Sequence, residues 1–213
     1  VWAHPEVFQM HPDGSAAMVA GVPPDDFRED GQLWGNPLYN WPSLAKNGYN
    51  WWIQRLRHAD WLYNRVRIDH FRGLSEYYAI PPTAASAREG VWRPGPGMDF
   101  LTKVRQELPG CALIAEDLGL VTGAVKALLK ESGLPGMKVL QFAFNPLDDS
   151  EHLPHNYALN TVAYTVTHDN DTVMGWMRSV PLEEVQFARQ YMNLNMREGY
   201  NWGFIHTLYA SAA

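Results

Sequence analysis

Acidic residues stand at the ends of three short apolar segments in this sequence. Asp69, Glu116 and Asp169 each follow such a segment, and Asp169 is preceded by His168. Short apolar segments separated by helical patterns are typical of parallel strands. The carboxyl ends of parallel strands meet at one edge of a sheet or one mouth of a barrel, where ligands bind. We therefore expect the three carboxylates to converge on one site.

A converging set of carboxylates suits the cleavage of a glycosidic bond with retention of configuration. That reaction needs one carboxylate as nucleophile and one carboxylic acid that protonates the leaving oxygen, about 5–5.5 Å apart. A third acid, here Asp169, can stabilise the positively charged transition state. Glu116 follows an apolar segment, so desolvation is expected to raise its pKa and suit it to the acid role. Arg67 precedes Asp69 by two residues, on the same side of a strand, and is expected to orient it and keep it ionised.

Some acids that follow strands have a simpler explanation. Such a residue is often the N-cap of the next helix, and this interpretation is favoured for Asp117 and Asp171. Cys111, just before an apolar run, is interpreted as a buried, inert thiol and not as a nucleophile. For Asp69, Glu116 and Asp169 the recurrence at three strand ends favours a functional site.

The elements that must position these acids follow from hydrophobic periodicity. Residues rich in Pro and Gly predict a loop-like region over about 1–45 and a second loop over 81–98. The alternation of helices and short apolar strands predicts a parallel α/β architecture. The expected helices cover 49–64, 100–108, 122–132 and 182–197, and the expected strands cover 65–69, 112–115, 138–144 and 161–167.

Composition limits the classes of protein that need consideration. Hydrophobic residues make up 46% of the 213 residues, enough for a real core, yet no run approaches a membrane span, so we expect a protein without a membrane partner. The net charge of −6 and scattered basic residues argue against nucleic-acid binding. A single cysteine fits a reducing compartment, and a cytoplasmic location is expected. The nine Trp and ten Tyr fit either sugar stacking or core packing.

Several segments in order resemble the 4-α-glucanotransferases, that is, the amylomaltases or disproportionating enzymes of glycoside hydrolase family 77, relatives of the α-amylases. The resemblance covers nearly the whole chain. It is carried by Trp2-Ala3-His4-Pro5-Glu6, Gly21-Val22-Pro23-Pro24-Asp25, Gly31-Gln32-Leu33-Trp34-Gly35-Asn36-Pro37-Leu38-Tyr39, Arg67-Ile68-Asp69-His70-Phe71-Arg72-Gly73, Ala115-Glu116-Asp117-Leu118-Gly119, Leu153-Pro154-His155-Asn156-Tyr157 and Thr167-His168-Asp169-Asn170-Asp171.

The resemblance implies an α/β fold, the (β/α)8 TIM barrel of the α-amylase type, of which this chain holds only the middle and C-terminal part. Residues 1–213 would form a partial catalytic barrel domain, with an acceptor-side loop region over 1–45 and strand–helix units over 46–213. The implied activity is retaining transfer of α-1,4-glucan segments to an acceptor glucose or maltodextrin through a covalent glycosyl-enzyme. No cofactor or metal is implied, and the partners are α-1,4-glucans and maltooligosaccharides.

The resemblance also assigns residues by motif position. Asp69 matches the nucleophile, Glu116 the acid/base and Asp169 the transition-state stabiliser. Arg67 and His168 match residues that bind the sugar at the cleavage point. Residues 21–39 resemble the acceptor-side loop, in which the expected substrate contacts are Trp34, Asp25 and Asn36.

Two positions depart from the family pattern, and other functions stay open. Asp26 stands where the family usually has Tyr, and Val166 where it usually has Gly. The loss of an aromatic platform at Asp26 leaves open an α-glucan hydrolase that uses the same carboxylates. A half barrel has unpaired strand edges, so a truncated, inactive glucan-binding fragment is a second alternative. A metal-dependent barrel hydrolase is the third, with ligand-type side chains in Asp69, His70, His168, Asp169 and Asp171.

Overall fold

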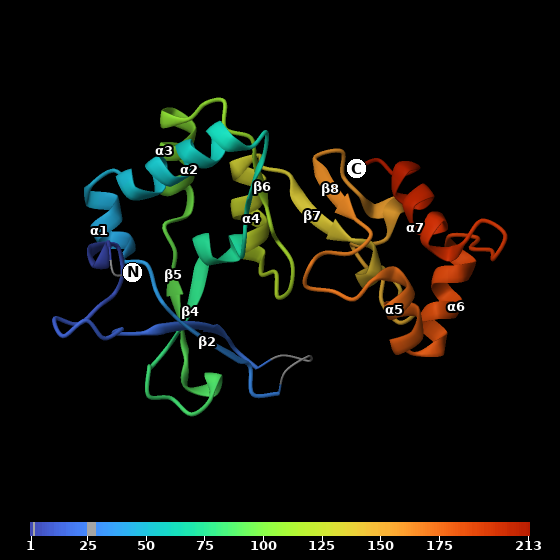
Figure 1. The fold of residues 1–213 in the computed structure, drawn as a ribbon, viewed down its shortest axis with the longest axis horizontal. Helices are drawn as coiled ribbons and strands as arrows, with labels where there is room; N and C mark the ends of the chain where they lie inside the picture. Colours follow the sequence, from blue (N-terminus) through green and yellow to red (C-terminus); the bar gives the residue numbers. More distant parts are fainter. Residues whose placement is uncertain (2, 25–28) are drawn as a thin grey trace. The chain divides into compact units, whose positions relative to one another are not determined.

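A computed structural model describes residues 1, 3–24 and 29–213 of the chain (Figure 1). The chain forms two compact units, Val1–Gly133 and Leu134–Ala213. Each unit is described by itself below.

The first unit contains a four-stranded antiparallel sheet in the order β2-β1-β4-β5. Its strands are β1 (Val19–Val22), β2 (Gln32–Pro37), β4 (Glu76–Ile80) and β5 (Val91–Pro94). Gly21 of β1 faces the Gln32 carbonyl oxygen and the end of the Ile80 side chain so closely that any Cβ at this position would clash. This glycine therefore lets β1 fit between its two neighbours.

A parallel pair of strands in the same unit lies next to the predicted site. β3 (Val66–Ile68) pairs with β6 (Leu113–Ala115), with Ile68 opposite Ala115. The helices of this unit are α1 (Trp41–Lys46), α2 (Asn50–Leu62), α3 (Gly97–Glu107) and α4 (Gly123–Ser132). Short 3-10 helices complete the unit: η1 (Pro5–Val7), η2 (Phe71–Leu74) and η3 (Ala87–Glu89).

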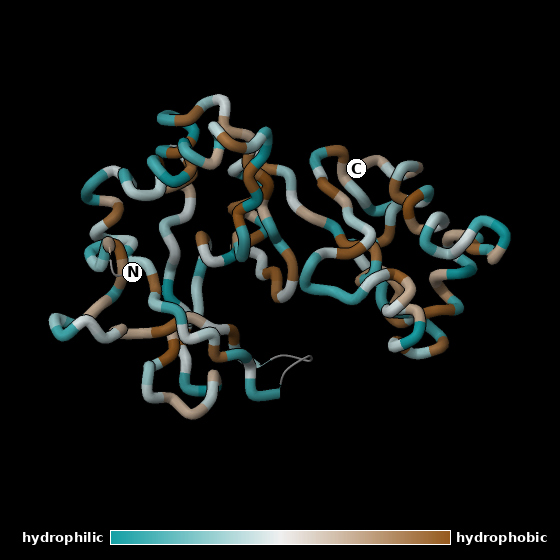
Figure 2. The backbone as a smooth tube through the Cα atoms, in the orientation of Figure 1, coloured by the Kyte–Doolittle hydropathy of each residue, from teal (hydrophilic) through white to brown (hydrophobic). Residues whose placement is uncertain are grey.

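Local sequence explains where these helices begin and end. The Thr122 side chain accepts a hydrogen bond from the Val125 amide and so caps α4, and Gly133 ends it in the left-handed conformation. The Asn40 side chain caps α1 in the same way. Helix α2 buries Ile53 and Leu56 on one face. Figure 2 shows the resulting alternation of hydrophobic and hydrophilic residues along the backbone.

The second unit is built on a parallel strand pair covered by helices. β7 (Gly136–Val139) pairs with β8 (Thr161–Tyr164). The other elements are η4 (Leu140–Ala143), η5 (Pro154–Asn156), α5 (Val173–Ser179), α6 (Leu182–Tyr191) and α7 (Tyr200–Tyr209). Phe144 lies at the centre of the core, 1% exposed, with ring contacts to Trp176, Phe187, Tyr191 and Phe204.

The helices expected over 49–64, 100–108 and 122–132 are confirmed as α2, α3 and α4. The strands expected over 65–69 and 112–115 are confirmed as β3 and β6, and they are parallel. The α/β class is therefore correct. Among the described residues the strands form three separate sheets and no closed barrel.

Other expectations were wrong. The segments 1–45 and 81–98, expected to be loops, contain β1, β2 and β5, and the sheet that these form with β4 is antiparallel, not parallel. β5 has only two apolar residues, Val91 and Trp92, and all four of its residues are exposed, so its sequence lacks the apolar run from which a strand is inferred. The strand expected over 138–144 ends at Val139, where η4 begins, and the helix expected over 182–197 ends at Tyr191.

We expect Phe144→Ala to lower the free energy of unfolding by about 3–5 kcal/mol, because it leaves a cavity among aromatic rings. Urea unfolding of the intact protein measures this loss. Leu147→Ala is the matched control, since Leu147 is 94% exposed and its loss should change stability by less than about 0.5 kcal/mol. Equal effects of the two substitutions would contradict the described core.

Candidate active site

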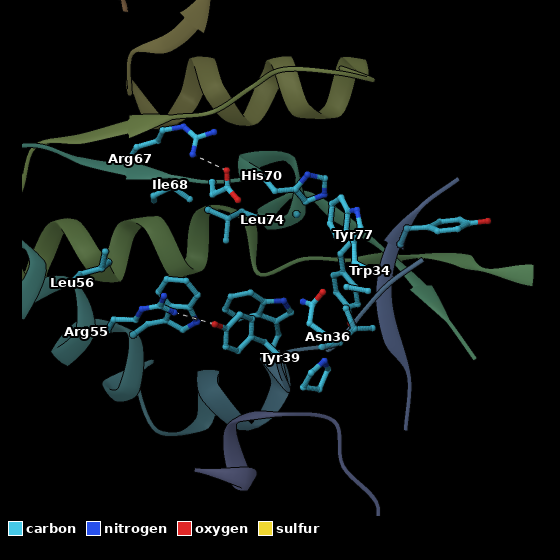
Figure 3. A pocket seen from close by; sticks show the side chains of 18 of the residues that line it. Trp34, Asn36, Tyr39, Arg55, Leu56, Arg67, Ile68, His70, Leu74 and Tyr77 are labelled. Carbon is cyan, nitrogen blue, oxygen red and sulfur yellow. Dashed lines mark hydrogen bonds and ion pairs between the residues drawn. The ribbon is translucent and has the colours of Figure 1, made fainter. Parts of the chain in front are cut away.

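Strand β3 presents a basic and an acidic side chain to the same side. Arg67 lies within β3 and Asp69 directly follows it, so alternation brings the two together. Arg67 Nη1 lies 2.7 Å from Asp69 Oδ1, and the dashed line from Arg67 in Figure 3 marks this ion pair. The Asp69 side chain is 76% exposed, whereas that of Arg67 is 27% exposed. The pair therefore orients a carboxylate that remains open to a ligand.

Glu116 follows β6 and is held by backbone amides. The His70 amide donates to Glu116 Oε2 at 2.6 Å, and the Leu118 amide donates to Oε1 at 3.0 Å. The backbone continues the strand pairing, because the Glu116 amide donates to the Ile68 carbonyl and the Phe71 amide to the Glu116 carbonyl, both at 3.0 Å. The segment after β3 is thus joined directly to the carboxyl group after β6.

Burial raises the pKa of Glu116 above its ordinary value, and the negative charge of Asp69 adds to this effect. The amides of Leu118 and His70 and the charge of Arg67 act in the opposite direction. Desolvation is the largest of these influences. The carboxyl group therefore keeps its proton to a higher pH than an exposed glutamate, as a general acid requires.

His70 links this site to the strand β2. Its backbone has a φ of 49°, in the left-handed region that non-glycine residues rarely adopt. Its ring meets that of Trp34 edge to face, with centroids 5.0 Å apart. Burial, together with the positive charge of Arg72, lowers the pKa of His70 to about 4, so the ring is neutral at pH 7. The sequence interpretation gave His70 a role only as a possible metal ligand.

A cavity of about 560 Å³ lies against the Arg67–Asp69 pair (Figure 3). Of the residues predicted to contact substrate, Trp34, Asn36 and Arg67 line it, as does Asp69. Aromatic side chains form much of its wall: Tyr39, Trp41, Trp52, Tyr77 and Tyr78.

Arg55 joins the aromatic residues on one wall of this cavity. Its guanidinium carbon lies 5.1 Å from the centre of the Trp52 ring, and its Nη1 donates to the Tyr39 hydroxyl at 3.1 Å. Trp52 and Trp41 also pack against Phe100 of the core. Trp41 and Trp52 therefore both line the cavity and pack against the core. Composition alone did not distinguish these two roles for the aromatic residues.

The third acid belongs to the second unit. His168 Nε2 lies 3.5 Å from Asp169 Oδ1, and both side chains are mostly exposed. The strand expected over 161–167 is β8, which ends at Tyr164, so His168 and Asp169 lie in the loop after it and not directly at the strand end. Their convergence with Asp69 and Glu116 stays a prediction.

The helix-cap interpretation of Asp117 and Asp171 was wrong. Thr122 caps α4, and Asp117 is buried, 8% exposed. Thr172 caps α5 by accepting from the Gly175 amide, while Asp171 Oδ1 accepts from the Thr172 amide. In both helices the N-cap is therefore a threonine hydroxyl that follows the expected aspartate in the sequence.

Two predicted positions, Asp25 and Asp26, lie outside the described residues. The thiol of Cys111 is half-buried, and burial with the nearby Asp60 raises its pKa to about 11, so it stays protonated at neutral pH. Across residues 1, 3–24 and 29–213 there is no cluster of three or more His, Cys, Asp or Glu side chains suited to a metal ion. Within the same ranges, no helix has the length and apolar character needed to cross a bilayer.

The fold and site together define an α/β protein with two carboxyl groups at the ends of adjacent parallel strands. The chain belongs to the 4-alpha-glucanotransferase family, whose family model matches residues 1–213. The family resemblance read from the motifs is therefore confirmed.

Similar proteins come from bacteria and plants. A 4-alpha-glucanotransferase of Streptococcus pneumoniae is 44% identical over 214 residues, which cover 100% of this chain and 42% of that protein. A chloroplastic/amyloplastic 4-alpha-glucanotransferase of Arabidopsis thaliana is 43% identical over 213 residues, which cover 100% of this chain and 37% of that protein. The solved structure of an amylomaltase from Streptococcus agalactiae in complex with acarbose aligns with a TM-score of 0.94 at 39% identity, covering 99% of this chain and 43% of that one. The chain thus spans less than half the length of these relatives.

We expect two substitutions to move the pKa of Glu116 in opposite directions. Asp69→Asn removes a negative charge and should lower it, whereas Arg67→Met removes a positive charge and should raise it. The pKa can be followed by NMR of the carboxyl carbon in protein labelled at glutamate, with Glu116→Gln to assign the signal. Shifts of the same sign would contradict the described charge arrangement.

Proposed function

We propose that the protein to which this chain belongs is a retaining 4-α-glucanotransferase. It moves a segment of an α-1,4-glucan to the hydroxyl of an acceptor glucose or maltodextrin. The observation that carries the proposal is the pair of carboxyl groups that follow β3 and β6, one exposed and ion-paired, the other half-buried with a raised pKa. Membership of the 4-alpha-glucanotransferase family supports it.

In the first step, an oxygen of the Asp69 carboxylate attacks C1 of the sugar at the cleavage point. The bond between C1 and the glycosidic oxygen breaks, its electron pair stays on that oxygen, and the oxygen takes the proton of Glu116. The shortened glucan leaves as an alcohol, and the transferred segment stays bound to Asp69 as an ester. Glu116 is now an anion.

In the second step, an acceptor hydroxyl replaces the departed glucan. Glu116 takes the hydroxyl proton while the oxygen attacks C1, which forms the new α-1,4 bond and releases the Asp69 carboxylate. Two inversions at C1 give net retention. Transfer exceeds hydrolysis only if the acceptor reaches C1 before water does.

The remaining predicted residues have binding and electrostatic roles in this proposal. Arg67 holds Asp69 in place for attack, supported by their 2.7 Å contact. Asp169 stabilises the positive charge that develops on the sugar, and His168 binds the sugar at the cleavage point. Trp34 and Asn36, which line the cavity, contact the substrate. The same role is proposed for Asp25 on the motif alone.

We propose further that the parallel pairs β3–β6 and β7–β8 belong to a (β/α)8 barrel of the α-amylase type. The similarity to the amylomaltase structure, at a TM-score of 0.94, supports this. In this proposal residues 1–45 form the acceptor-side region and 46–213 supply the strand–helix units, except for β4 and β5, which join the antiparallel sheet of β1 and β2. The substrates are α-1,4-glucans and maltooligosaccharides, consistent with the acarbose bound to that neighbour.

A cytoplasmic location is proposed on the single cysteine, which fits a reducing compartment. The plant relatives bear names that place those proteins in chloroplasts and amyloplasts. Cell fractionation with an antibody against the protein tests the location.

Asp69→Asn should lower turnover of maltooligosaccharides by roughly 10⁴-fold while glucan binding survives, because the amide keeps the shape of the nucleophile but cannot attack. Turnover is measured by chromatography of products, and binding by calorimetry with maltoheptaose. Asp13→Asn is the control, since Asp13 is an exposed acid in a turn and an amide oxygen can still accept the Ser15 hydrogen bonds. Near-normal transfer by Asp69→Asn would refute the assignment.

Incubation of the intact protein with maltotriose should give glucose together with maltooligosaccharides longer than the substrate. This outcome requires a sugar hydroxyl to compete with water for the glycosyl-enzyme. Chromatography of the products over time distinguishes the possibilities. Products no longer than maltotriose would instead indicate a hydrolase. This is the alternative suggested by Asp26, which stands in place of the usual aromatic residue.

A further inference from the structure

The residues between β6 and α4, 116–122, connect the acid Glu116 to the first turn of α4; they are called the acid loop here. Glu116 stands at its start, held by the amides of His70 and Leu118. Gly119, in its middle, has a φ of +78°, so the loop turns sharply there. The position of the Glu116 carboxyl group therefore depends on what holds the rest of this short loop.

The Arg72 guanidinium binds the middle of the acid loop. Its Nη1 donates to the Leu120 carbonyl oxygen at 2.7 Å, and its Nη2 donates to Glu76 Oε1, also at 2.7 Å. The side chain is only 5% exposed. Its central carbon lies 4.0 Å from the centre of the Trp92 ring on β5, so the charge is also covered by an aromatic face.

Glu76 extends the same connection to the end of the loop. Its Oε1 accepts a hydrogen bond from the Thr122 hydroxyl at 3.3 Å. Thr122 is the N-cap of α4, where its side chain also receives the Val125 amide. Arg72 and Glu76 thus contact the acid loop at Leu120 and Thr122, whereas backbone amides hold it at Glu116.

We propose that Arg72 is a positioning residue for the acid/base Glu116. It lies three residues after Asp69, in η2, and the same η2 segment follows the His70 amide that binds Glu116. Arg72 therefore connects the segment behind the nucleophile to the loop that carries the acid, and fixes where the Glu116 proton is delivered. This inference rests on the proposed function.

The geometry needs an arginine and not merely a positive charge. Two different nitrogens of a planar group reach two partners that lie on different elements. In Arg72→Lys a single ammonium on a flexible stem keeps the charge but cannot hold both partners in this arrangement. The acid loop would then shift relative to β3.

The test separates proton delivery from nucleophilic attack. The first turnover on maltotriose needs the Glu116 proton, because the leaving group is a sugar alkoxide unless protonated. The first turnover on α-maltosyl fluoride does not, since fluoride leaves as an anion without a proton. Glucose released and fluoride released in the first turnover are measured by rapid quench in the intact protein, and each rate is expressed per active site.

For Arg72→Lys we expect the maltotriose rate to fall on the order of 10²-fold, the scale for misplacing a catalytic group by about 1 Å, with the fluoride rate changed less than about threefold. The ratio of the two rates does not depend on how much protein folds. If both rates fall together, or neither falls, Arg72 does not position the acid.

Parallel variants keep the inference distinct from the proposed function. Glu116→Gln should show the same sparing of fluoride more strongly; if it does not, the acid/base assignment itself fails. Glu76→Gln should resemble a mild Arg72→Lys and carries the test if that variant is not recovered folded. The matched control is Glu107→Gln on α3, outside the acid loop. It breaks the Lys103–Glu107 ion pair, 2.8 Å long, which has the same four-residue spacing as Arg72–Glu76. Both the maltotriose rate and the fluoride rate of this control should stay normal.

Discussion

The pairing of β3 with β6 fixes the relative positions of the two carboxyl groups on which the chemistry depends. Ile68 lies opposite Ala115, and the ladder continues past the strand ends through the amides of Glu116 and Phe71. Because side chains alternate along a strand, a slip of one residue would turn Asp69 or Glu116 to the opposite face of the sheet. The hydrogen bond from the His70 amide to the Glu116 carboxyl group closes this arrangement. The backbone thus holds the Glu116 carboxyl group, while the Arg67 side chain orients that of Asp69.

The same arrangement gives two carboxyl groups of similar chemistry different environments. Asp69 is exposed beside Arg67, whereas Glu116 is half-buried after the apolar strand β6. Burial opposes ionisation of Glu116 more strongly than its amide donors favour it. Different roles for the nucleophile and the acid therefore follow from where each strand ends, although both reactive groups are carboxyl groups.

Much of the site could be predicted because its signal is local. An apolar run followed by an acid, with Arg67 two residues earlier, defines a strand end and its partner within a few residues. The antiparallel sheet could not be predicted in this way, since β1 and β4 are far apart in the chain and each is short. His70 and Arg72 belong to the motif over 67–73, but their contacts are with residues distant in sequence, Trp34 of β2 and Leu120 of the acid loop. The helix caps were misassigned because the nearest acid was preferred to a hydroxyl: Thr122 caps α4 at the expected start of that helix, and Thr172 caps α5.

The influence of Asp69 on Glu116 has a consequence for the reaction cycle. The negative charge of Asp69 raises the pKa of Glu116 as long as the nucleophile is free. In the proposed mechanism that charge disappears when the carboxylate becomes an ester, so the pKa of Glu116 falls at the stage when this group must exist as an anion. The affinity of Glu116 for its proton is thus high before cleavage and lower after it. The covalent state of Asp69 thus modulates the proton affinity of Glu116, in addition to the larger effect of burial.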